Sequence, residues 1–390
     1  MRHTRITLAL ITLLAAASCG GGDTNPRDNP ATPQSTLQRA CAWLWKQQAA
    51  DGGWHSETYG LMRSGQSLTP FVLHALLSVP EEQVIRPDGG VEKGLAFIRT
   101  HTNSEGCLGR SDRDIADYPN HSTAYAVRCL VAAGNKADAK LIRQMCDYLL
   151  AQQFNAANGT DPQSHRWGGW GFGSDGGVMD IGHTRHVLEA LHDAASLDAA
   201  CAERAQSFLR LLQRHPAEWR VQPEVPGEAP GDAGSTYDGG FYFSPTDTAM
   251  NKGRHQPAAG GRAAWYRSYA TATCDGLLSL LAAGVSETDE RVKAAASWLD
   301  KHPAIDHPAG IPQDDPTPWY VAVHYYHVAV RAEAWRALGR KGDWKTQIER
   351  HLAASQRANG SFVNENSPLM KENDPVLCTA LAVVALAHCA

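Results

Sequence analysis

The sequence predicts an all-α fold in which six inner and six outer helices form an (α/α)6 toroid. A unit of helix, glycine-rich loop and second helix recurs about six times along the chain. The first helix of each unit is amphipathic, whereas the second is almost entirely apolar or small, which is typical of a helix buried on all sides. Strand patterns are weak throughout. Because one unit cannot bury its apolar face alone, the copies must stack, and twelve helices of alternating character make two concentric rings.

The six units follow one another along most of the chain. The clearest copy is the stretch 43–54, in which Gln48 and Trp54 flank a Gly-Gly turn, followed by an apolar helix over 69–79. Residues 202–214 are a typical amphipathic first helix, and residues 124–133 a typical apolar second helix. The predicted units span residues 36–79, 91–133, 139–195, 201–283, 290–338 and 344–390.

The fourth unit contains an insertion, residues 214–265, that is rich in Pro and Gly. Long segments of this kind inside a compact domain are usually functional or disordered. The insertion carries the aromatic residues Trp219, Tyr237, Phe241, Tyr242, Phe243 and Trp265. This aromatic content favours an ordered cap over one mouth of the ring.

The N-terminal segment is typical of an exported protein. Arg2 and Arg5 precede the apolar run 6–17, which is too short for a stable transmembrane helix and ends in small residues before Cys19. This pattern resembles a bacterial lipobox, which implies that Cys19 is lipidated and anchors the chain in the cell envelope, on the periplasmic face or the cell surface. An ordinary signal peptide cut near Ala17 is the alternative.

The chain is therefore expected to divide into three parts. These are a lipoprotein signal peptide over residues 1–18, a disordered tether over 19–36, and the toroid over 37–390. Loss of Arg2 and Arg5 with the signal peptide takes the formal net charge from -5 to -7. Because the chain has no basic stripe, we expect no nucleic-acid partner. The lipid on Cys19 makes the membrane an expected partner.

The cysteines leave two possibilities open. Of the nine cysteines, Cys19 would carry the lipid, and the remaining even number permits disulfides in an exported protein. Most of them, however, lie in apolar helical stretches such as residues 127–133, where buried free thiols are at least as well expected.

The glycine-rich loops resemble those of a known superfamily. The Gln-x3-Gly-x-aromatic pattern at residues 48–54 and 356–362, and with an insertion at 153–170, is similar to the QW repeats of squalene–hopene cyclases and the related repeats of protein prenyltransferase β-subunits. Exported bacterial proteins with prenyltransferase/squalene-oxidase repeats are the nearest match. The resemblance implies a central cavity for an apolar or terpenoid small molecule.

We expect the loop glutamines and aromatic residues to have a structural rather than a catalytic role. A glutamine amide such as that of Gln48 or Gln356 can hold the terminal backbone groups of neighbouring helices. The aromatic ring, Trp54 or Phe362 in the same loops, can pack on the outer helix.

Two adjacent acids resemble part of a catalytic motif. Class II cyclases of this superfamily use an Asp-x-Asp-Asp-Thr motif to protonate an alkene, and residues 312–317 are the nearest sequence here. Asp314 and Asp315 match its last two acids, but Pro312 replaces the first. Paired carboxylates can raise one pKa, as a general acid requires, so the resemblance implies Asp314 and Asp315 as catalytic residues. A helix N-terminus capped by Asp before Pro316 is the alternative interpretation.

Protein prenyltransferases bind a catalytic zinc through Asp, Cys and His, and this sequence matches those ligands only in part. Cys274 matches the cysteine ligand, but Ala272 stands where the aspartate should be. The sixth unit offers Asp374 and Cys378 without a histidine at the corresponding point. We therefore predict neither a metal site nor a cofactor.

Two histidine pairs, His183 with His186 and His324 with His327, have a spacing that places both rings on one helix face. Such pairs suit acid–base work or metal binding, with buried core histidines as the alternative. We take His183 and His324 as further catalytic candidates. Because the N-termini of inner helices should ring the cavity mouth, the predicted ligand-binding residues are Asp180, Tyr242, Tyr269, Asp275, Trp319, Tyr320, His327 and Asp374.

Three functions fit this sequence. The first is a cyclase-like isomerase or lyase that uses an aspartic acid as proton donor and aromatic walls to stabilise a carbocation. The second is a non-catalytic binding or scaffold lipoprotein, with residues 214–265 plugging the mouth. The third is a carbohydrate-active (α/α)6 enzyme, which predicts an open groove with exposed tryptophans and two nearby carboxylates.

Overall fold

The computed structural model describes residues 34–110, 116–173, 178–218, 220, 223–228 and 237–390. By its internal contacts the chain divides into Met1–Gln34 and Ser35–Ala390, and the second unit contains all the elements that follow. The predicted signal peptide and Cys19 lie outside the described residues.

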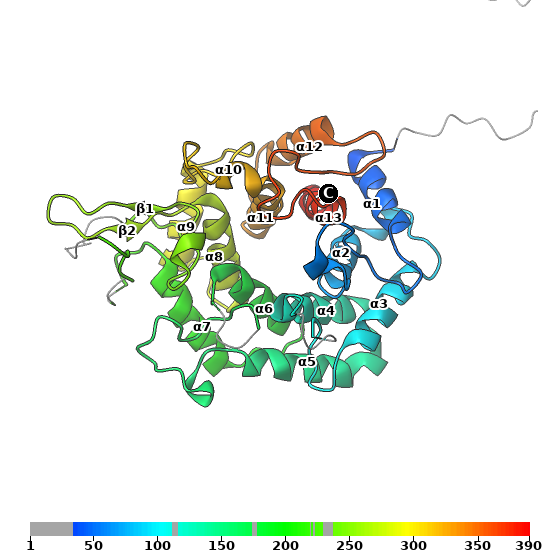
Figure 1. The fold of residues 1–390 in the computed structure, drawn as a ribbon, viewed down its shortest axis with the longest axis horizontal. Coiled ribbons are helices and arrows are strands. Elements are labelled where there is room, and N and C mark those ends of the chain that lie inside the picture. Colours follow the sequence, from blue (N-terminus) through cyan, green and yellow to red (C-terminus); the bar gives the residue numbers. More distant parts are fainter. Residues whose placement is uncertain (1–33, 111–115, 174–177, 219, 221–222, 229–236) are drawn as a thin grey trace, which may run out of the picture. The chain divides into compact units, whose positions relative to one another are not determined.

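Six helices surround the centre of this unit, each in contact with the next, and the last returns to the first (Figure 1). In order around the ring they are α2 (Leu68–Leu77), α4 (Pro119–Ala133), α6 (Ile181–Asp193), α8 (Ala270–Ala282), α11 (His324–Ala337) and α13 (Pro375–Cys389). They are the apolar second helices of the repeat. In α8, every residue from Ala270 to Leu280 is buried, as expected for a helix covered on all sides.

Six amphipathic helices pack outside this ring. They are α1 (Thr36–Lys46), α3 (Gly90–His101), α5 (Ala139–Ala151), α7 (Ala199–Leu212), α9 (Glu290–Lys301) and α12 (Trp344–Ser355). Each buries one face against inner helices and leaves the other to solvent; α5, for example, buries Met145, Cys146, Tyr148 and Leu149. The predicted (α/α)6 toroid is confirmed.

Short elements complete the described part of the chain. They are α10 (Trp319–Ala322), the 3-10 turns Gly60–Met62, Glu81–Gln83, Lys136–Asp138, Ala156–Asn158 and Thr248–Met250, and the strands β1 (His255–Gln256) and β2 (Trp265–Tyr266). The two strands pair antiparallel within the insertion and project beside α9 (Figure 1). No helix among the described residues is long and apolar enough to cross a membrane.

Four glutamines connect successive outer helices. The Gln48 amide donates to the carbonyl of Gly52 in its own loop, at 3.0 Å, and to that of Gly90 at the start of α3, at 2.8 Å. The equivalent donors are Gln153, to Gly168 and Cys201; Gln213, to Gly239 and Arg291; and Gln356, to Gly360 and Thr36. The last of these joins α12 to α1 and closes the outer ring. These contacts give Gln48 and Gln356 a structural role.

A threonine in the first turn of an inner helix repeats with equal regularity. The hydroxyl of Thr69 accepts the backbone N–H of Trp54 at 2.9 Å. The equivalent pairs are Thr123 with Leu108, Thr184 with Trp170, Thr273 with Phe241 and Thr379 with Phe362. In α11 this position holds His327, whose Nε2 lies 3.0 Å from the Ala304 carbonyl. Each pair ties the buried loop to the inner helix that follows it.

The cysteines of the described residues form no disulfide. All eight of them, from Cys41 to Cys389, are buried free thiols. Of the two possibilities that the sequence left open, the structure shows the second.

The loop glycines approach neighbouring helices so closely that a side chain cannot fit. Gly168 has a φ of +87°, and a Cβ on it would lie 1.8 Å from the Arg204 carbonyl oxygen. Gly159 has a similar φ of +78°, but nothing lies within 4 Å of its Cβ position. We therefore expect Gly159→Ala to cost about 1–2 kcal/mol of unfolding free energy from backbone strain alone.

Gly168→Ala should cost a further 1–3 kcal/mol or so, because the outer helix must move to relieve the clash. Urea denaturation of both variants measures the difference. Equal losses of stability would show that the close approach of loop and helix does not constrain the ring.

Candidate functional site

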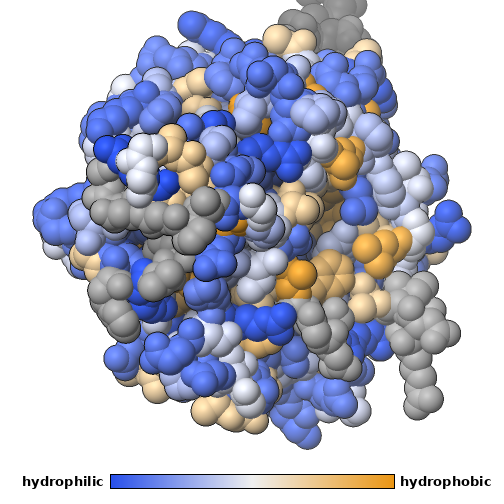
Figure 2. Space-filling model, turned by 60° about the vertical axis from the view of Figure 1, so that its left-hand side comes forward, coloured by the Kyte–Doolittle hydropathy of each residue, from blue (hydrophilic) through white to orange (hydrophobic). Residues whose placement is uncertain are grey.

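A cavity of about 270 Å³ lies among the six inner helices and is lined mainly by apolar and aromatic side chains. The insertion adds Phe243, Met250 and Lys252 to the lining. The face shown in Figure 2 is hollowed, and hydrophobic residues lie between hydrophilic ones around the hollow. Apolar and aromatic lining residues include Leu68, Phe71, Tyr118, Tyr125, Tyr269, Tyr326, Leu377, Leu381 and Val384.

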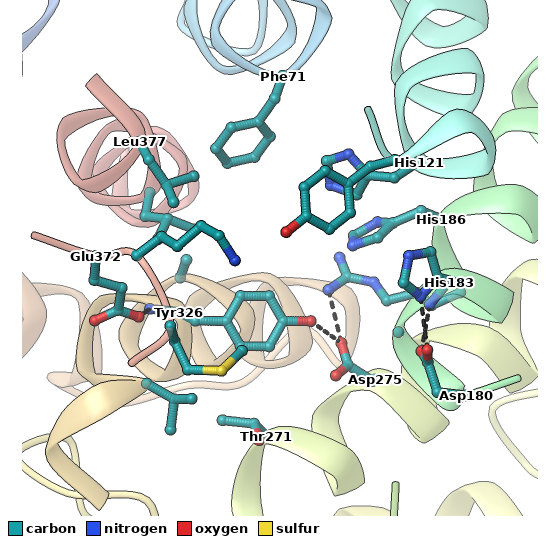
Figure 3. A pocket seen from close by; sticks show the side chains of 18 of the residues that line it. Phe71, His121, Asp180, His183, His186, Thr271, Asp275, Tyr326, Glu372 and Leu377 are labelled. Atoms are coloured by element: carbon teal, nitrogen blue, oxygen red, sulfur yellow. Dashed lines mark hydrogen bonds and ion pairs between the residues drawn. The ribbon is translucent and has the colours of Figure 1, made fainter. Parts of the chain in front are cut away.

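Asp180 and His183 form one polar pair of the lining. One carboxylate oxygen of Asp180 caps α6 by accepting the backbone N–H of His183 at 2.8 Å. The other carboxylate oxygen of Asp180 lies 2.7 Å from Nδ1 of the His183 ring. Burial opposes the charged imidazole, but the Asp180 carboxylate outweighs it and raises the pKa of His183. Figure 3 shows the pair on the α6 side of the cavity. The carboxylate thus already has a partner within the protein.

Arg185 forms the centre of a second, more deeply buried network. Its guanidinium donates to Glu189 at 2.8 Å and to Asp275 at 3.2 Å, and it lies 2.8 Å from the Glu333 carboxylate. The Tyr326 hydroxyl donates to the same Asp275 oxygen at 2.8 Å (Figure 3). Three carboxylates surround one arginine that is 1% exposed, so its charge is fully compensated.

Lys252 brings a different kind of charge to the cavity. Its side chain is 4% exposed, and the ammonium lies 4.6 Å from the centre of the Phe243 ring and 5.1 Å from that of Trp319. Among the described residues, no carboxylate lies within 4 Å of it. Burial lowers the pKa of Lys252 to about 8, with Asp180, Asp275 and Asp247 opposing the shift from a distance.

Lys371 is a second lysine of the lining. It lies over two rings, 5.9 Å from Tyr59 and 5.7 Å from Tyr118, and no described carboxylate pairs with it. Both Lys371 and Tyr118 adopt left-handed backbone conformations, with φ values of 63° and 49°. Two strained residues other than glycine are therefore in contact at the cavity, which is where strain tends to be retained for function.

Glu372 begins the turn that leads into α13 and is 1% exposed. Its carboxylate accepts the backbone N–H groups of Tyr325 at 3.0 Å and Tyr326 at 2.8 Å, at the start of α11, and the amide of Asn364 at 2.9 Å. Burial outweighs these hydrogen bonds and raises the pKa of Glu372 to about 7. The group therefore titrates near neutral pH.

The structure brings four of the predicted residues to the cavity, Asp180, His183, Tyr269 and Asp275. Asp314 is exposed and does not line it. Asp315 pairs with Arg254 of the insertion and accepts the Thr317 N–H, so it does not cap a helix either, since α10 begins at Trp319. Asp315 is thus paired with a protein cation, and neither acid belongs to the described cavity lining.

The other predicted residues lie away from the lining. His324 contacts His351 of α12 at 3.0 Å, and burial together with that imidazole lowers the pKa of His324 to about 4. Tyr242 is buried beneath Tyr266, and Asp374 caps α13. The Trp319 ring lies under the Lys252 ammonium, and Tyr320 packs at the edge of the core. Nε2 of His327 lies 3.0 Å from the Ala304 carbonyl oxygen. These side chains support the cavity without facing it.

Sequence reasoning missed the lining residues Arg185, Lys252, Tyr326, Lys371 and Glu372. Arg185 had a usable signal, since a charged residue in an apolar inner helix must be paired when buried. Lys252, Lys371 and Glu372 lie in irregular loops, where no periodicity relates a side chain to the ring centre.

No family model and no curated relative matches the sequence. Several solved structures, however, align with the structure of this chain. A variant of type II terpene cyclase MstE from Scytonema, in complex with geranylgeranyl dihydroxybenzoate, aligns with a TM-score of 0.55 at 12% identity, over 91% of this chain and 96% of that chain. The chain has the fold of the type II terpene cyclases.

Two further solved structures agree with this result. A second MstE variant, in complex with merosterolic acid A, aligns with a TM-score of 0.52 at 13% identity, over 90% of this chain and 95% of that chain. A protein from Actinoplanes aligns with a TM-score of 0.50 at 16% identity, over 91% and 98% of the two chains. Identities this low establish the terpene cyclase fold and no activity.

The titration of Glu372 predicts a specific pH dependence of stability. Because its pKa is raised on folding, the protonated form contributes stability that is complete below the unfolded value, near 4.5, and is lost as the pH rises through about 7. Glu372→Gln removes this titration. Relative to wild type, the variant should therefore gain about 1–3 kcal/mol of unfolding free energy between pH 5 and pH 8.

Chemical denaturation at the two pH values measures this gain, and Glu365→Gln, at an exposed position near the same loop, is the control. A wild-type-minus-variant difference that does not change with pH would contradict the assignment.

Proposed function

We propose that the chain binds an apolar molecule of terpenoid size in the cavity of the toroid. The observation that carries the proposal is the lining itself, in which all six inner helices surround one space and α2, α4, α11 and α13 contribute apolar or aromatic side chains to it. A preformed, mainly apolar pocket with a few polar groups is typical of a small-molecule site. The likeness to MstE structures in complex with geranylgeranyl dihydroxybenzoate and merosterolic acid A supports a ligand of this class.

The polar groups of the described lining favour binding over protonation of an alkene. An alkene is a weak base, so its protonation needs a strong acid in its protonated form, and a neighbouring cation favours the ionised carboxylate instead. Asp180 is paired with His183, and Asp275 with Arg185. Glu372, with a pKa of about 7, is a weak acid.

A second observation favours binding over cyclisation. The Lys252 ammonium lies on the face of Phe243, a ring that would otherwise stabilise a carbocation. A resident positive charge at that place repels a second one. Cyclisation remains the second candidate through Asp180, the cavity carboxylate held beside an imidazole.

The two other functions considered from the sequence have less support. The carbohydrate-active alternative expects exposed tryptophans along a groove, and the described lining contains no tryptophan. The scaffold alternative expects a mouth without converging acids, whereas Asp180, Asp275 and Glu372 all reach the cavity. Residues 243–252 of the insertion contribute to the lining rather than filling it.

We also propose that the toroid is held at a membrane by a lipid on Cys19. The small residues before Cys19 and the glycines after it support this anchor. Metabolic labelling with a fatty-acid analogue should mark the full-length protein expressed in bacteria, and Cys19→Ala should abolish the label while Cys41→Ala, at a buried thiol, keeps it. Equal labelling of both variants would contradict the anchor.

The binding proposal is tested with geranylgeraniol, an uncharged isoprenoid alcohol, and a matched pair of leucine variants. Leu377 in α13 is half-buried and lines the cavity. Leu77, the last residue of α2, is also half-buried but does not line the cavity. Leu377→Gln should weaken binding about tenfold or more, because it removes apolar contact worth roughly 1.5–3 kcal/mol. Leu77→Gln should leave affinity unchanged.

Tryptophan fluorescence quenching measures both affinities, and mass spectrometry of the recovered ligand separates the two candidates. Unchanged geranylgeraniol is the expected result. A cyclised product that disappears in Asp180→Asn would favour the enzyme, and failure of the wild type to bind any isoprenoid would overturn both.

A further inference from the structure

The cavity contains two kinds of charged groups that differ in their partners. Arg185 and His183 are each held by carboxylates at 2.7–3.2 Å within the protein. Lys252 and Lys371 lie against aromatic rings, and no described carboxylate lies within 4 Å of either ammonium. Both lysines line the same cavity, although they lie far apart in the sequence.

Lys252 carries the greater part of the argument because it is buried. An ammonium group taken out of water without a counter-ion is costly, and cation–π contacts return only a part of that cost. A solvent-facing lysine would avoid it altogether. The position is therefore better explained by a negative charge that arrives with a ligand than by any gain in folding stability.

The surroundings of Lys371 point to the same place. Its left-handed backbone and that of Tyr118 are each unfavourable by about 1–3 kcal/mol. Tyr118 and Tyr269 also stand at the N-cap positions of α4 and α8, and neither provides a side-chain cap. Both residues line the cavity, so the N-termini of α4 and α8, whose Asn120 and Ala270 N–H groups donate to loop carbonyls, begin beside the lysines.

The geometry points to an apolar ligand that carries one carboxylate, with the head held by Lys252 and Lys371 and the tail along Phe71, Leu381 and Val384. This inference rests on the proposed binding function and names the class of molecule that the cavity selects. The carboxylates of the lining have partners of their own: Asp180 contacts His183, Asp275 and Glu333 contact Arg185, and Glu372 accepts backbone N–H groups of α11.

A diphosphate head group fits the same residues less well. Its higher charge is usually held by several cations or by a metal ion bound to clustered acids. The described residues contain no group of three His, Cys, Asp or Glu side chains placed to hold a metal, and the guanidinium of Arg185 is occupied by three carboxylates. Two ammonium groups match a single carboxylate.

The test compares geranylgeranoic acid with geranylgeraniol on the full-length protein, because the two molecules share a tail and differ in the charge of the head. Wild type should bind the acid at least about tenfold more tightly than the alcohol. Lys252→Met should remove most of that preference, and Lys371→Met should act in the same direction. Circular dichroism and thermal melting of each variant show that it is folded.

Lys345→Met is the matched control, since Lys345 also lies over an aromatic ring, Trp344, but on an outer helix. It should keep the full preference for the acid. Equal binding of acid and alcohol by wild type, or a preference that survives both cavity variants, would overturn the inference while leaving the binding function intact. Tighter binding of geranylgeranyl diphosphate than of the acid would overturn the carboxylate assignment. Failure to bind all three molecules would instead remove the proposed function itself.

Discussion

The closure of the inner ring determines the rest of this structure. An apolar helix such as α8 or α13 can be stable in water only if neighbours cover it on every side, and a linear stack would leave the first and last of the series exposed. The contact between α13 and α2 removes both ends at once. The hydrogen bond from Gln356 to the Thr36 carbonyl does the same for the outer layer. A central space surrounded by side chains from all six inner helices is the geometric consequence of that closure.

The repeated hydrogen bonds explain why so divergent a sequence keeps this fold. Each connecting loop passes through the interior, where backbone groups must find partners. The glutamine satisfies carbonyls of the loop and of the next outer helix, and the threonine accepts the N–H of the loop residue that enters the core. In α11, His327 takes the place of the threonine and bonds a loop carbonyl instead. A ligand-binding role predicted for His327 therefore conflicts with the structural contact that it makes.

The fold could be predicted from the sequence because its signals are periodic, whereas the site could be predicted only in part. Asp180, His183 and Asp275 were identified because they lie in inner helices, whose first turns must face the centre. Lys252 and Lys371 lie in loops, where the chain path decides the direction of a side chain and no spacing reveals it. The Asp314-Asp315 pair shows the opposite problem, since the sequence contains a familiar pattern that lies away from the described cavity lining, with Asp315 bound to Arg254 of the insertion.

The contrast between paired and unpaired charges is what distinguishes this cavity from a simple apolar core. Arg185 with Glu189, Glu333 and Asp275 forms a compensated network, and such networks are structural in many proteins, because removing one member leaves the others buried without a partner. Lys252 has no such explanation. The nearest neighbours of the Lys252 ammonium are the aromatic rings of Phe243 and Trp319. Lys252 forms part of the cavity wall, so its charge acts on any molecule in the cavity. A terpene cyclase fold thus presents here a buried lysine at the cavity, and this lysine is the basis of the proposed preference for an anionic head group.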